Sequence, residues 1–320
     1  QQHGLGRSGL ISADFFRHEY HINYALAHSP IPQIALWDGL VFGGGVGVSL
    51  YGKYRVATEH SLWAMPETMI GFFPDVGALY QMPKIMPSMG MVSYLALTGH
   101  RLTAPDLMYS GLATHYVNSD DLESLTEALE LTLAPQNSQR ISSVETAIEE
   151  VLDSFSRPPR ECPPEESFLA KHNQVLHQTF DNVDQPLEEV LASLRQLEND
   201  NADFGSQTLE TLEQMSPTSL KITWELLRLG RSIPGLEQHL ALEYRLSQHL
   251  MKPGSDFHEG IRATLLDSKK KNKKPAQWNP PKLSQVSNQH IEQYYFAQPI
   301  TEEWMAFPSP IFTNYEESRL

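Results

Sequence analysis

A run of glycines followed by two isolated acids constrains this chain more than any other part of its sequence. The run is Gly43-Gly44-Gly45-Val46-Gly47, and glycine lets the backbone approach a ligand closely because it has no Cβ. Glu67 and Asp75 follow within apolar sequence. Backbone N–H groups near carboxyl groups are the parts that acyl transfer needs, since N–H groups stabilise an oxyanion and acids transfer protons or attack a carbonyl.

The flanking sequence indicates where the glycines lie. Ile31 to Trp37 reads as a short strand, and Asp38-Gly39 is a turn signal. Val46 to Leu50 has the small and apolar residues of a buried helix start. We therefore expect the glycines in a strand-to-helix turn, where free N–H groups and the helix dipole favour an anion or a polarised carbonyl. The alternative is that the glycines only allow a helix to pack closely on a sheet.

The two acids also have a structural alternative. Asp75 precedes a segment from 76 to 80 that looks like a helix start, so a helix N-cap is the competing role for it. A carboxyl group in apolar surroundings has a raised pKa, which suits an acid or base that works near neutral pH. We expect Glu67 and Asp75 to divide the chemistry between them.

Composition narrows the class of protein. With 320 residues, of which 40% are hydrophobic, the chain can bury a sizeable core. A net charge of -15 argues against a nucleic-acid partner, and no stretch approaches the roughly 20 apolar residues of a membrane span. The single cysteine, Cys162, excludes an internal disulfide. His258-Glu259 lacks a second histidine one turn on, so no metal site is expected.

The character of the chain changes near residue 120. Before it, we expect strands within 31–37, 53–58, 61–64 and 113–117 and helices over 78–86, 90–97 and 104–110, an α/β arrangement. After it, apolar residues at three-to-four spacing predict helices over 121–133, 143–155, 166–180, 187–198, 205–215, 219–231 and 235–251. We expect an α/β core over 1–120, a helical region over 121–297 and an irregular tail over 298–320.

These motifs together resemble the 3-hydroxyisobutyryl-CoA hydrolases, a branch of the crotonase (enoyl-CoA hydratase/isomerase) superfamily. The resemblance runs from about Phe15 to about Trp278. Besides the glycine run, it rests on Tyr54–Glu59, Leu62–Thr68, Phe73–Gly77, Leu95–Gly99, Met215–Thr223, Glu243–Gln248 and Asp256–Ala263. The later motifs are not shared by short hydratases, so the resemblance is specific to the hydrolase branch.

The resemblance implies a crotonase-like α/β core (the ClpP/crotonase spiral) with a helical C-terminal half. It also implies thioester hydrolysis of 3-hydroxyisobutyryl-CoA, or a close short-chain 3-hydroxyacyl-CoA, in mitochondrial valine breakdown. Glu67 and Asp75 match the catalytic pair, and Gly44 matches an oxyanion-hole donor. The substrate-binding positions are Glu19, Gly43, Gly44, Glu67 and Asp75. No cofactor is expected, since coenzyme A is part of the substrate. Association into a homo-oligomer is compatible with the resemblance.

Gly47 distinguishes between activities of the superfamily. Hydratases that resemble this chain carry a glutamate two residues after the glycine triplet, and they need it together with the later glutamate to add water to a double bond. With Gly47 at that position and Asp75 added, the resemblance favours attack on a thioester carbonyl, by Glu67 itself or by a water that it activates. The alternatives are a hydratase or isomerase, and a non-catalytic scaffold such as a subunit of the mitochondrial ribosome.

The start of the chain departs from the family pattern. Gln1-Gln2-His3-Gly4 falls in what relatives have as a loop, after the first strands and a Cys-Ala-Gly-Gly-Asp type motif that supplies a second oxyanion donor. We expect this chain to lack that segment. Loss of one donor typically costs about 10²–10³ in rate, and loss of strands exposes a sheet edge.

Coenzyme A is polyanionic, so basic groups must offset the acidic field of the chain. The candidates are Lys269 to Lys274, Arg55 and Arg262. The alternative for the lysine run is a solvated loop, as is usual for blocks of like charge.

Overall fold

A computed structural model describes residues 3–134, 143–197, 201–267 and 274–297, with side chains from residue 13 onward. Its strands form two small parallel sheets. One has the order β1-β3-β5, with β1 at Ile34–Trp37, β3 at Tyr54–Ala57 and β5 at His115–Tyr116. The other pairs β2, Leu40–Phe42, with β4, Leu62–Ala64. Parallel strands need crossover connections, which place helices on their faces.

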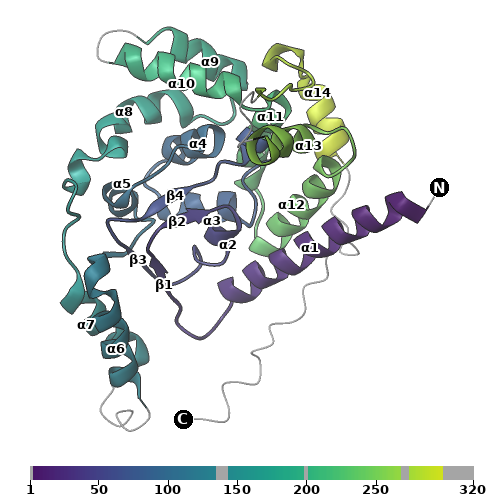
Figure 1. Cartoon of the computed structure of the whole chain (residues 1–320). Helices are drawn as coiled ribbons and strands as arrows, with labels where there is room; N and C mark the ends of the chain where they lie inside the picture. Colours follow the sequence, from purple (N-terminus) through teal and green to yellow (C-terminus); the bar gives the residue numbers. More distant parts are fainter. Residues whose placement is uncertain (1–2, 135–142, 198–200, 268–273, 298–320) are drawn as a thin grey trace.

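Helices cover these sheets (Figure 1). Those of the first part are α1 (His3–Ala27), α2 (Gly44–Gly47), α3 (Ala78–Ile85), α4 (Met89–Thr98) and α5 (Ala104–Tyr109), with a 3₁₀ turn, η1, at Glu67–Ile70. Every regular element described after β5 is helical. The longer ones are α6 (Leu122–Leu133), α7 (Val144–Phe155), α8 (Phe168–Phe180), α9 (Leu187–Arg195), α10 (Ala202–Gln214), α11 (Pro217–Gly230) and α12 (Leu236–Leu250), followed by α13 (Asp256–Ile261) and α14 (Asn288–His290).

The predicted strands and helices are present, with ends shifted by a few residues. Three local features differ from what the sequence indicated. β2 follows the Asp38-Gly39 turn directly and was missed, because three residues are too few to show a period. Val46 to Leu50, read as the start of a buried helix, lie in and just after the single turn α2, and Val48 is 50% exposed.

The third difference is at the start of the chain. His3 and Gly4, expected in a loop, belong to α1, which runs along α12 (Figure 1). Phe16 and Tyr20, one helical turn apart, are both buried in the core. Packing of one apolar face against α12 therefore stabilises a helix whose sequence alone gives little signal.

The apolar core crosses residue 120. One cluster of buried residues runs from Phe16 of α1 through Leu95 of α4 to Leu246 of α12. α4 is buried along nearly its whole length, as expected of a helix that is apolar on all sides. A second, smaller cluster lies between β3, β5, α6 and α7 and comprises Tyr54, Val56, Val117, Leu125, Leu129, Ile148 and Leu152.

Two exposed leucines mark the strand edges. Leu36 of β1 is 41% exposed and Leu40 of β2 is 73% exposed. β1 lies at the edge of its sheet, with β3 as its one recorded neighbour. No helix of the described part of the chain is long and apolar enough to cross a bilayer. The predicted tail over 298–320, like Lys269 to Lys273, lies outside the described residues.

Candidate active site

Glu67 lies in the turn that follows β4. It is the first residue of η1 and only 6% exposed. The turn is fixed to the core because the Thr68 hydroxyl donates a hydrogen bond of 3.0 Å to the Leu97 carbonyl of α4. Phe72 N–H donates to the Glu67 carbonyl at 3.0 Å. The Oε2 atom of Glu67 is buried without a hydrogen-bond partner, so this oxygen is free to react.

Asp75 is also 6% exposed and is held by α1. The Tyr20 hydroxyl donates a hydrogen bond of 2.8 Å to Asp75 Oδ2. The alternative that Asp75 caps a helix is wrong, because the N-cap of α3 is Gly77 and no side chain caps it. The Gly77 N–H donates instead to Glu243 Oε2, at 2.9 Å.

The backbone after Asp75 is strained. Val76 has φ 57° and Gly77 has φ 70°, so two successive residues lie in the left-handed region. Glycine tolerates this conformation, but a buried β-branched valine held there costs about 1–3 kcal/mol. The Tyr51 hydroxyl donates to the Val76 carbonyl at 2.9 Å. Strain of this kind is typical of functional sites, where the surrounding structure holds it in place.

The glycine run forms the opposite wall. Gly43, with φ 50°, turns the chain from β2 into α2, as the sequence predicted for a strand-to-helix turn. A Cβ on Gly43 would lie 3.0 Å from Glu67 Oε1, and one on Gly44 would lie 2.7 Å from Glu19 Oε1. Gly44 begins α2, where N–H groups have no acceptor within the helix. Glu19, Gly43, Gly44 and Glu67 therefore gather at one place, near enough to Asp75 for the charges of Glu19 and Glu67 to act on its carboxyl group.

Burial sets the electrostatics of the carboxyl groups. It raises the pKa of Glu67 to about 8, with a smaller contribution from the Glu19 charge and an opposing hydrogen bond from the backbone. The pKa of Asp75 is raised well above its usual range, first by burial and then by the charges of Glu243, Glu67 and Glu19. Burial and the Glu243 charge also raise the pKa of Glu19. Desolvated acids with raised pKa values are typical of catalytic sites.

Gly47 has no room for a side chain. A Cβ there would lie 2.6 Å from Val76 Cβ and 2.7 Å from Asn23 Nδ2. Asn23 is fully buried, and neither polar atom of its side chain has a hydrogen-bond partner. The position where related hydratases carry a glutamate is therefore filled by neighbouring residues.

The two arginines proposed to offset the charge of coenzyme A are already engaged. Arg55 donates to the backbone carbonyls of Gly52, Gly111 and Leu112. Arg262 pairs with Glu259 and Asp267. Both guanidinium groups therefore already have partners within the chain, and a role for either toward coenzyme A stays a prediction. Within the described residues, no three side chains gather as ligands for a metal ion.

Sequence reasoning assigned no role to several residues around the acids. Tyr20, Asn23, Tyr51 and Glu243 reach the site from α1, from the segment after α2 and from α12. Tyr20 adjoins Glu19, and Glu243 opens a motif that carried the family resemblance. The available signal was a polar side chain at a position that the helical pattern places on the buried face.

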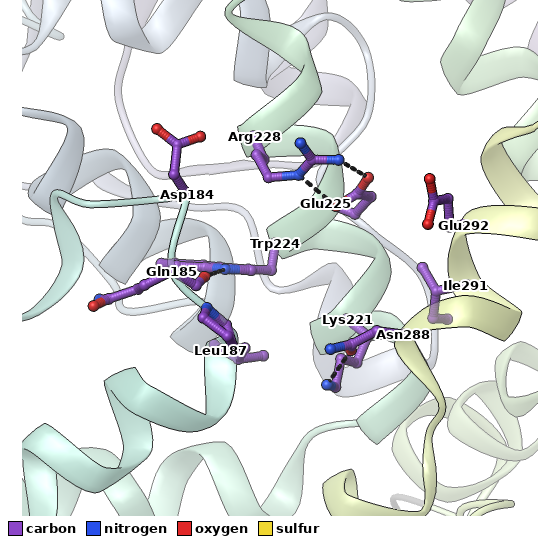
Figure 2. Close-up of a pocket in the computed structure, with 11 residues that line it drawn as sticks. Asp184, Gln185, Leu187, Lys221, Trp224, Glu225, Arg228, Asn288, Ile291 and Glu292 are labelled. Atoms are coloured by element: carbon purple, nitrogen blue, oxygen red, sulfur yellow. Dashed lines mark hydrogen bonds and ion pairs between the residues drawn. The ribbon is translucent and has the colours of Figure 1, made fainter.

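A separate cavity of about 190 Å³ lies between α11, the segment before α9 and α14 (Figure 2). Its two cations already have carboxylate partners, since Lys221 pairs with Glu188 and Arg228 with Glu225. The cavity shares no lining residue with the acid pair. It is therefore not the site of the chemistry.

The fold and the paired acids indicate an enzyme of the crotonase class. Comparison with known proteins supports the same class. The family profile of enoyl-CoA hydratase/isomerase matches residues 2–295. The chain belongs to this family, and within it to the 3-hydroxyisobutyryl-CoA hydrolases. A relative in Xenopus tropicalis, named mitochondrial 3-hydroxyisobutyryl-CoA hydrolase, is 40% identical over 91% of this chain and 70% of its own length. The human protein of that name is 39% identical over 89% of this chain and 68% of its own length.

Solved structures share the fold. A carnitinyl-CoA dehydratase from Mycobacterium thermoresistibile superposes with a TM-score of 0.73 at 27% identity, covering 94% of this chain and 76% of that protein. An enoyl-CoA hydratase from Rhodobacter sphaeroides gives a TM-score of 0.72 at 28% identity, covering 92% and 76%. The crotonase-like fold predicted from the motifs is confirmed.

Proposed function

We propose that this chain hydrolyses the thioester of 3-hydroxyisobutyryl-CoA, or of a close short-chain 3-hydroxyacyl-CoA, as a mitochondrial enzyme of valine breakdown. The observation that carries the proposal is the pair of desolvated acids, Glu67 and Asp75, beside the Gly43-Gly44 turn. The names of the hydrolase relatives agree with it.

The chemistry breaks the bond between the acyl carbon and sulfur. Gly44 N–H stabilises the oxyanion that develops on the thioester oxygen. In one route, Glu67 attacks the acyl carbon, and water then hydrolyses the mixed anhydride. In the other, Glu67 takes a proton from a water that attacks directly. Both routes deliver the free 3-hydroxy acid, and the sulfur of coenzyme A leaves as a thiol after it gains a proton.

The remaining candidates act on the substrate. Asp75 faces the substrate hydroxyl or the attacking water, and Glu19 contacts the substrate from α1. The reaction needs no cofactor, because coenzyme A enters as part of the substrate. No nucleic-acid partner is expected, given the acidic net charge.

The alternatives find less support. A hydratase needs a second acid where Gly47 lies, and Asn23 and Val76 fill that space. A scaffold without turnover has no use for two buried acids with raised pKa values. The relatives from Xenopus tropicalis and from human are named as hydrolases.

The test measures both reactions on the same protein. We expect thiol release from 3-hydroxyisobutyryl-CoA, followed with a thiol reagent, and no hydration of crotonyl-CoA, followed by loss of its double-bond absorbance. Hydration without thiol release would contradict the proposal. Calorimetry with coenzyme A distinguishes the hydrolase from a non-catalytic scaffold. A scaffold would release no heat of binding even with millimolar coenzyme A. Mass analysis of Glu67 after turnover in H₂¹⁸O tests the anhydride route, since ¹⁸O enters the side chain only when water attacks the Glu67 carbonyl of an anhydride. Its appearance there would establish that route.

A homo-oligomer forms part of the proposal. The exposed leucines Leu36 and Leu40 adjoin a groove of about 500 Å³ at the strand edges. Exposed apolar residues at unpaired strand edges favour association with another copy.

A further inference from the structure

Glu243 is fully buried beside the site, yet the chemistry above gives it no role. It lies on α12 and is 0% exposed. Its Oε2 accepts the hydrogen bond of 2.9 Å from Gly77 N–H. Its Oε1 lies 3.1 Å from Nδ1 of His239, which is one turn earlier on the same helix and equally buried. That approach makes no hydrogen bond, so the bond from Gly77 N–H is the one that satisfies this buried carboxyl group.

The Gly77 N–H belongs to a peptide unit that is held at both ends. The carbonyl of that unit is on Val76, and it accepts the hydrogen bond from the Tyr51 hydroxyl at 2.9 Å. Tyr51 and Glu243 come from distant parts of the chain. Rotating the peptide would break both hydrogen bonds in a buried place, where unpaired polar groups are costly.

The peptide has to be held because its own conformation is unfavourable. Val76 and Gly77 are both left-handed, and a valine rarely adopts that region. Released from its partners, the turn would relax toward an ordinary conformation. Asp75 is the residue immediately before the turn, so such a change would move its carboxyl group away from Tyr20 and Glu67.

We propose that Glu243 is a positioning residue for Asp75: its hydrogen bond to Gly77 N–H keeps the strained turn in the orientation that directs the Asp75 carboxyl group at the substrate. The inference rests on the proposed thioesterase function. Glu243 acts through the main chain and does not touch the substrate.

The first arm of the test compares two substitutions in the full chain. The amide oxygen of Glu243→Gln can accept the same hydrogen bond without the charge, whereas Glu243→Ala cannot. We expect Glu243→Ala to lower kcat by about tenfold or more with KM nearly unchanged, and Glu243→Gln to stay within about threefold of the unsubstituted chain. Glu237→Ala, on the exposed face of the same helix, is the matched control and should keep its rate.

The second arm does not depend on activity. Hydrogen exchange of the Gly77 amide should be slow in the unsubstituted chain and in Glu243→Gln, and fast in Glu243→Ala. If the chain releases no thiol at all, the proposed function fails, and this exchange still decides whether Glu243 holds the turn. If Glu243→Ala does not fold, Tyr51→Phe releases the other end of the same peptide and should lower kcat with KM unchanged.

Three results would overturn the inference. They are an unchanged kcat in a folded Glu243→Ala, a Gln variant as slow as the Ala variant, and a Gly77 amide that stays protected without the carboxylate.

Discussion

The hydroxyl of Tyr20 donates a hydrogen bond of 2.8 Å to Asp75 Oδ2, and both groups are buried. The two residues lie 55 positions apart. This bond ties α1 to the turn before α3, so the first helix of the chain forms one wall of the site. The same helix contributes Glu19, whose carboxylate faces Gly44.

Glu67→Gln tests the role of the central acid. Glutamine keeps the size of the side chain and loses the basic or nucleophilic oxygen, so thiol release should fall by about 10² or more with little change in affinity for coenzyme A. The measurement pairs a thiol assay with calorimetry. Glu150→Gln, on the exposed face of α7, should change neither quantity.

Asp75→Asn tests the second acid and its contact with Tyr20. The structure shows no helix-capping role for the Asp75 side chain, so the free energy of unfolding should not fall, while turnover should fall by about tenfold or more. Tyr20→Phe removes only the hydroxyl and should reduce turnover less. Kinetics and urea denaturation of both variants provide the measurement. Unchanged turnover in Asp75→Asn would remove this residue from the mechanism.

The raised pKa of Glu67 predicts a pH dependence of both rate and stability. Activity requires the ionised acid, so kcat/KM should rise with pH and level off above about 8. Between its ordinary pKa of 4.5 and about 8, the folded state binds more protons than the unfolded state. The free energy of unfolding should therefore fall as the pH rises through this range, and Glu67→Gln should reduce that fall. Urea denaturation at pH 5 and pH 8.5 measures the change in the free energy of unfolding. An equal change in the unsubstituted chain and in Glu67→Gln would contradict the raised pKa.

Gly47→Ala tests whether the space beside Val76 is filled. Its Cβ would press on Val76 and Asn23, so the variant should lose about 1–3 kcal/mol of stability. Gly45→Ala is the matched control in the same helical turn, where a Cβ meets nothing within 4 Å. That change should leave stability the same or raise it by about 0.4–1 kcal/mol. Equal stabilities of the two variants would show that the site has room for a side chain.

Leu40→Lys tests association at the strand edge. A charge at this exposed position should shift sedimentation toward the smaller species, because charged edge strands resist pairing. Leu131→Lys, at a similarly exposed leucine of α6, is the control and should not shift it. If Leu40→Lys leaves the sedimentation distribution unchanged, the contact between copies lies elsewhere on the surface.

The sequence by itself determined the local parts of this protein. The glycine run marked the turn into α2, short apolar runs marked β1, β3, β4 and β5, and three-to-four spacing marked the long helices. It also singled out Glu67 and Asp75 as candidate catalytic acids, because an acid in an apolar run stands out against its neighbours. These features depend on residues close together in the chain, where steric and periodic rules apply directly.

Only the tertiary structure decided what surrounds the acids. Glu243 reaches Gly77 across 166 residues, and Tyr20 reaches Asp75 across 55. Both contacts form because α1 and α12 pack against the turn before α3, and no local pattern encodes which elements meet. The same packing removes the acids from water, and this burial, more than any single neighbour, raises the pKa of Glu67 and of Asp75.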